Sequence, residues 1–139
     1  MILRALLLCW CIPLAANAAN VGQTPPVLTG MDLQTGQAVD LGALHGRVVL
    51  VDFWASWCAP CLKSLPLYAR LRDEFPRADF EIIAISVDED AADAQAFLKR
   101  VDVQFPIVHD DGSRASAWSP PGMPSAFLID RQGLIKSRH

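Results

Sequence analysis

Two cysteines separated by two residues are the group in this sequence best suited to chemistry. Cys58 and Cys61 flank Ala59 and Pro60, follow an apolar segment and precede a helical pattern. A thiol at a helix N-terminus faces the positive end of the helix dipole, which lowers its pKa. Two thiols at this spacing can attack a disulfide and then resolve the mixed disulfide. The pattern predicts thiol–disulfide exchange, with Cys58 facing solvent as the nucleophile and Cys61 turned inward as the resolving thiol.

Other uses of a closely spaced cysteine pair fit less well. A zinc site needs two further ligands, and the histidines show no recognisable ligand spacing. Haem attachment needs a histidine directly after the second cysteine, where Leu62 stands. We therefore predict no metal site and no cofactor. The three histidines are expected on the surface: His45, His109 and His139.

The segment that precedes the cysteines predicts a buried strand. Val48–Trp54 is almost wholly apolar and shows no polar alternation, which is typical of a strand covered on both faces. Asp52 is the one charged residue in this run. Burial disfavours the charged form of a carboxyl group, so we predict a raised pKa for Asp52.

From about residue 25 to residue 139, the sequence resembles the thioredoxin-like superfamily, most closely the periplasmic thiol:disulfide oxidoreductases of the TlpA/ResA-like group. The resemblance is carried by the Cys-x-x-Cys motif, by Asp52 six residues before Cys58, by Pro66 five residues after the second cysteine, and by Gly122-Met123-Pro124-Ser125. It implies an α/β, thioredoxin-like three-layer fold with a mixed central sheet and an N-terminal β-hairpin extension.

The resemblance also implies roles for individual residues. Pro124 would be cis and face the cysteines, and the backbone of Met123 would pair with an extended substrate. Asp52 would accept the proton of Cys61, through a water, as the mixed disulfide resolves. We expect Trp57 to shield the disulfide and contact substrate.

The residues between the cysteines bear on the direction of exchange. We expect Ala59 and Pro60 to tune the redox potential, and neither is a histidine that would stabilise a thiolate. This favours a reductant over a strongly oxidising protein. The resemblance implies that such a reductant acts on disulfides of exported proteins, with a role in cytochrome c maturation, and is recharged by a membrane thiol-transfer protein. A peroxiredoxin-like thiol peroxidase is disfavoured, because Val51 and Ala55 stand where those enzymes carry proline and threonine or serine. A non-catalytic thioredoxin-fold binding module would not need both cysteines.

The chain suggests one domain, residues 19–139, behind a cleaved signal peptide, residues 1–18. Arg4 precedes an apolar run that ends in Ala16-Asn17-Ala18, as in secretory signals. Export implies a periplasmic protein with no stable membrane insertion after cleavage, and we expect the protein to be a monomer. The net charge of −3 gives no indication of nucleic-acid binding. The sequence ends at His139, before the last strand and helix of the family, so we expect a C-terminally truncated fold.

The remaining pattern predicts alternating strands and helices. We expect a helix over Ala59–Phe75, with Leu67, Leu71 and Phe75 on one face and a kink near Pro66. Asp88-Glu89-Asp90 is expected to be a solvated helix start. The other expected elements are a hairpin (Val27–Thr29, Gln37–Val39), a helical turn (Asp40–Leu44), strands Phe80–Val87 and Phe105–Val108, helices Ala91–Arg100 and Ser113–Trp118, and a closing hairpin (Ser125–Asp130, Leu134–Lys136).

Overall fold

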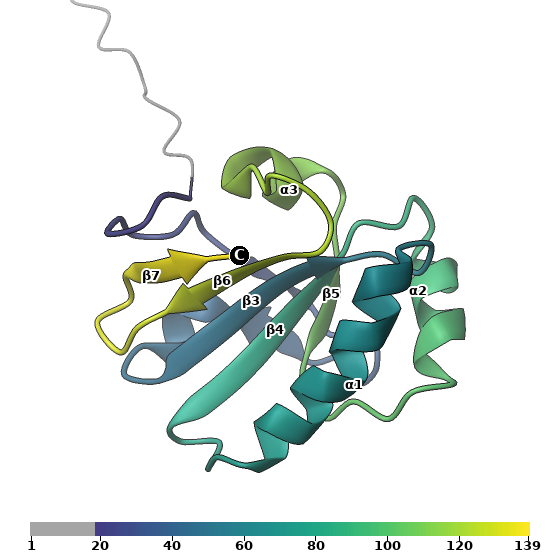
Figure 1. The fold of residues 1–139 in the computed structure, drawn as a ribbon, viewed down its shortest axis with the longest axis horizontal. Helices are drawn as coiled ribbons and strands as arrows, with labels where there is room; N and C mark the ends of the chain where they lie inside the picture. The colour runs from purple at the N-terminus through teal and green to yellow at the C-terminus, as the bar shows by residue number, and fades with distance from the viewer. Residues whose placement is uncertain (1–18) are drawn as a thin grey trace, which may run out of the picture.

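A five-stranded mixed sheet forms the centre of the computed structural model, which describes residues 19–139 (Figure 1). The predicted signal peptide lies outside the described residues. In spatial order the strands are β5 (Ile107–His109), β4 (Phe80–Ser86), β3 (Val48–Trp54), β6 (Ser125–Ile129) and β7 (Ile135–Arg138). β3 runs parallel to β4 and antiparallel to β6, which makes the sheet mixed.

The two central strands owe their position to their composition. Every residue of β4 is buried, and in β3 only Val48 is partly exposed. Continuous apolar runs of this kind can be accommodated where both faces of the sheet are covered. The sequence predicted β3 with these bounds, and it predicted β4 to within one residue.

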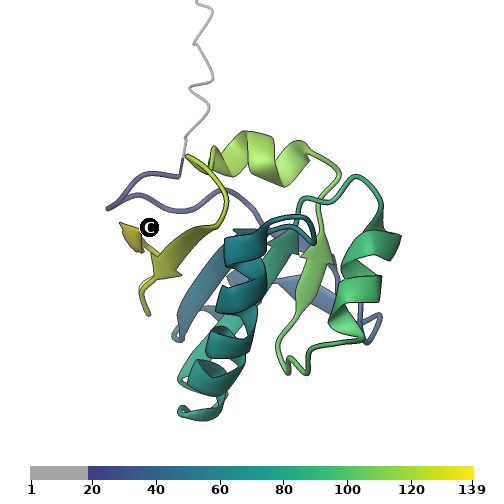
Figure 2. The ribbon, with the colours of Figure 1, turned by 45° about the vertical axis from the view of Figure 1, so that its right-hand side comes forward.

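Helices cover both faces of the sheet (Figures 1 and 2). Leu65 and Phe97, from two of the helices, share one apolar cluster with the sheet, while Trp118 belongs to a second cluster on the opposite face. The expected three-layer α/β fold is therefore confirmed. The helices are α1 (Ala59–Asp73), α2 (Ala91–Leu98) and α3 (Ser113–Trp118). None of the helices within residues 19–139 is long and apolar enough to cross a membrane.

The predicted N-terminal hairpin is present, although its strands begin later than expected. β1 (Thr29–Met31) and β2 (Ala38–Asp40) pair antiparallel, and a short 3-10 helix, η1 (Leu41–Leu44), follows. The hairpin lies along the sheet edge, because the backbone N–H of Leu33 donates to the carbonyl oxygen of Ile107 at 2.8 Å. It therefore covers the outer edge of β5.

The predicted buried face of α1 was only partly right, because Leu71 packs against the apolar cluster but the other two residues do not. Leu67 and Phe75 are 54% and 48% exposed, whereas Leu65 and Arg72 are buried. Arg72 donates from Nε to Oε1 of Glu81 at 2.9 Å, so the helix turns a charged residue toward the sheet and pairs it there. Buried charges are tolerated only when they are paired in this way. The helix is continuous through Pro66, and the kink stays a prediction.

The acidic run before α2 is only partly as predicted. Asp90 caps the helix by accepting from the backbone N–H of Ala92 at 2.9 Å, and Glu89 is exposed. Asp88, however, is 3% exposed, so its predicted solvated position was wrong. Its side chain turns away from α2 toward the loop that precedes Cys58, where it accepts hydrogen bonds from Ser56.

We expect Asp90→Ala to lower the free energy of unfolding by about 1 kcal/mol, because it removes the side-chain acceptor of an N-cap. Urea denaturation followed by circular dichroism would measure the change. Glu89→Ala is the matched control. It removes a neighbouring exposed carboxylate that forms no hydrogen bond within residues 19–139. Equal destabilisation by the two variants would contradict the capping role.

Candidate active site

The two cysteines lie at the start of α1 and are joined by a disulfide. Cys58 is the N-cap residue, Cys61 lies in the first turn, and their Cα atoms are 5.3 Å apart. Pro60 also lies in the first turn, where its missing N–H removes none of the helical hydrogen bonds. Both sulfurs therefore sit where the helix dipole favours a thiolate.

Exposure differs from the prediction for the first cysteine. Cys61 is fully buried, as expected. Cys58 is only 5% exposed, so the prediction that it faces solvent was wrong for the disulfide form. In the disulfide form both residues pack in the apolar cluster between α1 and the sheet, together with Trp54 and Ala55. The exposed residues around the pair are instead Trp57, at 69%, and the two residues between the cysteines. The shielding role of Trp57 stays a prediction.

The sheet brings the segment around Pro124 to the same end of the molecule as the cysteines. Because β6 runs antiparallel to β3, its first residue Ser125 pairs with Phe53, near the last residue of β3. The Met123–Pro124 peptide bond is cis, as the resemblance implied, and Met123 packs against the cluster that contains both cysteines. Ser125 holds this loop by donating from Oγ to the carbonyl oxygen of Gly122 at 2.7 Å.

Asp52 lies on the face of the sheet that meets α1. Alternation along β3 places it with Leu50 and Trp54, which belong to the same cluster as Cys61. Its neighbours in register on the two adjoining strands are Ala84 and Ala126, which are among the smallest side chains available. The space above Asp52 is therefore left to the carboxyl group and to α1.

Burial raises the pKa of Asp52 from its ordinary value of 3.8 to about 7, as predicted. Its two carboxyl oxygens find no hydrogen-bond partner within the described chain, so nothing there compensates for the lost hydration. On α1, burial and the negative charge of Asp52 together raise the pKa of Tyr68 to about 12. Asp52 can thus take up or release a proton near neutral pH.

Sequence reasoning missed the residues that hold the loop between β3 and Cys58. Asp88 accepts hydrogen bonds from both the backbone N–H and the Oγ of Ser56. The available signal was an acidic residue just after a buried strand that runs parallel to β3, because the carboxyl ends of parallel strands meet at one edge of a sheet. Among residues 19–139, no cluster of three or more histidine, cysteine or acidic side chains is arranged to hold a metal.

Comparison with known proteins bears directly on this dithiol. The family model described as Redoxin matches residues 20–139. This chain belongs to the Redoxin family. The thiol-disulfide oxidoreductase ResA of Bacillus cereus (strain ZK / E33L) is 33% identical to this Redoxin-family chain over 117 residues, which cover 84% of the chain and 67% of the relative. ResA of Bacillus subtilis (strain 168) is 34% identical over 101 residues, 72% of the chain and 56% of the relative.

Solved structures agree with these relatives. A candidate thiol:disulfide interchange protein DsbE from Chlorobium tepidum superposes with a TM-score of 0.82 at 33% identity, covering 88% of this Redoxin-family chain and 86% of the other. The thioredoxin domain of a thiol-disulfide oxidoreductase from Bacteroides vulgatus gives a TM-score of 0.78 at 27% identity, covering 86% and 88%. The resemblance to TlpA/ResA-like, thioredoxin-fold proteins is confirmed, and the protein is a thiol-disulfide oxidoreductase.

Proposed function

We propose that this protein reduces disulfide bonds of exported proteins in the periplasm, with a role in cytochrome c maturation. It would be a monomer, exported by its signal peptide and recharged by a membrane thiol-transfer protein. The dithiol made of Cys58 and Cys61 would carry the electrons.

The observation that carries the direction is that neither residue between the cysteines carries a charge that could stabilise a thiolate. Ala59 and Pro60 are both exposed and uncharged, so the helix N-terminus is the main local source of stabilisation for a Cys58 thiolate. That source contributes up to ~2 kcal/mol. A dithiol whose reduced form is weakly stabilised has a low reduction potential and gives up its electrons readily. Asp52, when ionised, would further disfavour a thiolate nearby.

The exchange proceeds in two balanced steps. The Cys58 thiolate attacks one sulfur of the substrate disulfide, a new S–S bond forms, and the other substrate sulfur leaves as a thiolate. Cys61 then loses its proton, and its sulfur attacks the sulfur of Cys58. This forms the Cys58–Cys61 disulfide and releases the second substrate thiolate. The substrate gains two electrons and the dithiol loses two. The disulfide in this structure corresponds to the end of that sequence.

Asp52 would accept the proton that Cys61 releases. A carboxyl group with a pKa of about 7 is well matched to a proton transfer near neutral pH. It lies on the sheet face that packs in the same cluster as Cys61, and the transfer would run through a water. The same group would return the proton when the donor protein recharges the disulfide.

The reduction potential tests the proposed direction. We expect a value near that of thioredoxin, about −270 mV, from equilibration with a glutathione buffer. A value near −120 mV, the strongly oxidising end, would contradict a reductant.

Cys61→Ala in the full-length protein, expressed in the periplasm, should trap exported substrates on Cys58. Capture of no protein by this variant would contradict the proposed substrates.

Trp57→Ala should weaken the reduction of protein substrates while leaving stability unchanged. The side chain is 69% exposed, so its removal should alter the free energy of unfolding by less than about 0.5 kcal/mol. An exposed aromatic ring beside the dithiol can contact a large substrate. We therefore expect the KM for insulin, as the disulfide substrate, to rise roughly threefold to tenfold. The rate with a small disulfide is the control. Equal loss with both substrates would contradict a contact specific to proteins.

A further inference from the structure

Asp88 is a buried carboxylate that the exchange reaction does not use. It is 3% exposed, and within residues 19–139 it forms no ion pair with a basic side chain. Both its oxygens lie 3.1 Å from the backbone nitrogen of Ser56, and Oδ1 accepts from the Oγ of Ser56 at 2.6 Å. Oδ2 accepts from the Oγ of Ser86 at 2.8 Å. A carboxylate 32 residues away therefore binds the loop before the cysteines.

Ser56 occupies the turn that places the nucleophile. The backbone N–H of Cys58 donates to the carbonyl oxygen of Ala55 at 3.1 Å, which closes a turn with Ser56 at its first corner. That turn ends at Cys58, the N-cap of α1. The contacts of Asp88 with the backbone and the hydroxyl of Ser56 thus fix one side of the turn, and through it the position of Cys58 over the helix N-terminus.

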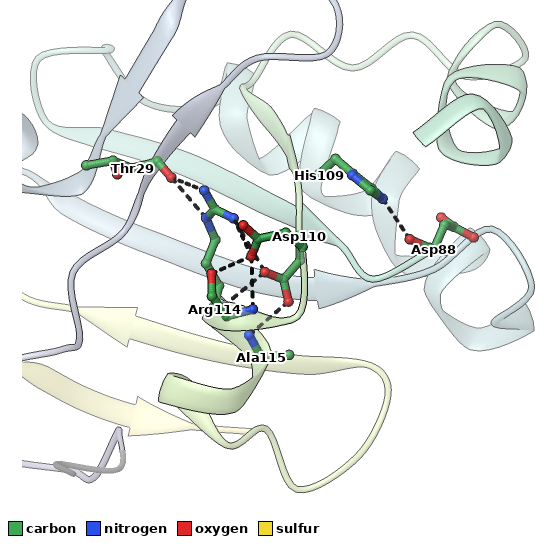
Figure 3. Close-up of polar contacts among 8 residues, drawn as sticks. Thr29, Asp88, His109, Asp110, Arg114 and Ala115 are labelled. Atoms are coloured by element: carbon green, nitrogen blue, oxygen red, sulfur yellow. Dashed lines mark hydrogen bonds and ion pairs between the residues drawn. The ribbon is translucent and has the colours of Figure 1, made fainter. Parts of the chain in front are cut away.

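The backbone around Asp88 is itself fixed by both neighbouring strands. Its carbonyl oxygen lies 2.7 Å from Nε2 of His109, which must donate because a carbonyl oxygen can only accept (Figure 3). The N–H of Asp110 donates to the carbonyl oxygen of Ser86 at 2.8 Å, and the N–H of Val87 donates to that of Trp54 at 2.9 Å. These hydrogen bonds hold the backbone of Asp88 in place, so its carboxylate is fixed relative to the loop before Cys58.

We propose that Asp88 is a positioning residue, whose carboxylate holds the Ala55–Cys58 turn so that the Cys58 sulfur stays at the helix N-terminus when the disulfide opens. The hydrogen-bond acceptors of Asp88, rather than its charge, provide this effect. A negative charge near Cys58 would by itself oppose thiolate formation, so the two effects have opposite signs. The inference rests on exchange at the dithiol and not on the reductant direction proposed above.

Alkylation of Cys58 by iodoacetamide tests this without any partner or substrate. The full-chain protein is reduced, the rate is followed across pH, and the modified residue is identified by mass spectrometry. In Asp88→Ala we expect the rate at pH 7 to fall about tenfold, with the midpoint of the profile displaced to higher pH, because the sulfur is no longer held over the helix N-terminus. Asp88→Asn keeps an acceptor oxygen for Ser56 and should stay within about threefold of the natural protein.

Asp110→Ala is the matched control. Asp110 is a buried carboxylate at the end of the neighbouring strand, and it accepts from the backbone N–H groups of Arg114 and Ala115 in α3 rather than from the turn (Figure 3). This variant should keep the alkylation rate within about twofold. If Asp88→Ala does not fold, Ser56→Ala replaces it, with an expected loss of about threefold from removal of the 2.6 Å hydrogen bond.

Three results would overturn the proposal. The first is a rate within twofold of the natural protein in folded Asp88→Ala, or in Ser56→Ala if that variant replaces it. The second is a pH profile of Asp88→Ala displaced to lower pH, which would mean that Asp88 acts on Cys58 through its charge alone. The third is an Asp88→Asn variant as slow as Asp88→Ala. Since alkylation involves neither substrate nor donor, these results are separate from the potential and the trapped substrates that test the proposed function.

Discussion

Replacing Asp52 with asparagine is expected to raise the free energy of unfolding of the oxidised protein by roughly 4 kcal/mol at pH 8 and by little at pH 4. The folded-state pKa of about 7 lies above the ordinary value of 3.8, so the folded protein binds this proton more tightly than the unfolded chain. Below pH 4 the carboxyl group is protonated in both states and its titration costs nothing. Between about pH 4 and pH 7 the cost of ionising it in the fold grows, and above pH 7 it is complete. Asparagine is neutral throughout and avoids that cost.

Urea denaturation of the oxidised proteins at several pH values measures this difference. Asp73→Asn, at the exposed end of α1, is the control for loss of one negative charge and should show no comparable change with pH. If the gap between Asp52→Asn and the natural protein is the same at pH 4 and pH 8, the raised pKa of Asp52 is wrong. The same variant should exchange disulfides more slowly, since the amide cannot accept the proton of Cys61.

Cys58→Ser is expected to lower the rate of disulfide reduction at least about a thousandfold, to the uncatalysed background. A hydroxyl group is hardly ionised at neutral pH, so the thiolate that attacks the substrate is lost. Reduction of insulin by the protein and an excess of dithiothreitol, followed by turbidity, gives the rate. Cys61→Ser should also fail to turn over, but for another reason, because it can form the mixed disulfide and cannot resolve it.

The contrast between the two cysteine variants assigns their roles. A single-turnover experiment with a small aromatic disulfide should show release of one thiol from Cys61→Ser and none from Cys58→Ser. The opposite pattern would mean that Cys61 is the attacking thiol. The full burial of Cys61 makes that outcome unexpected, since a substrate sulfur could not reach it without opening of the loop.

Local pattern was enough to predict the parts of the fold that consist of continuous apolar runs. β3 and β4 are such runs, and their composition leaves no other place for them than the centre of a sheet. The hairpin strand β1 was misplaced by two residues, because it has three residues and two of them are exposed. A strand so short has too little periodicity to fix its bounds.

The errors in the site came from contacts between segments that are distant in sequence. Spacing identified the cysteines, and the apolar run around Asp52 was enough to predict its burial. The position of Pro124 followed from the resemblance to a family, and the sheet register then supported it. The burial of Asp88 depends on Ser56, and the burial of Arg72 depends on Glu81, so neither could be inferred from the helix or turn that carries it. Periodicity describes one element at a time and contains no information on such pairs.

The two alanines beside Asp52 limit how the core of this protein could be redesigned. Elsewhere under a helix, exchanging alanine for valine is an ordinary way to fill space and gain stability. At Ala84 and Ala126, which adjoin Asp52 on either side, the two added methyl groups of a valine would enter the space around the carboxyl group that we propose gains and loses a proton. A more tightly packed variant would thus exchange protons less easily, and at these two positions stability and turnover would be in competition.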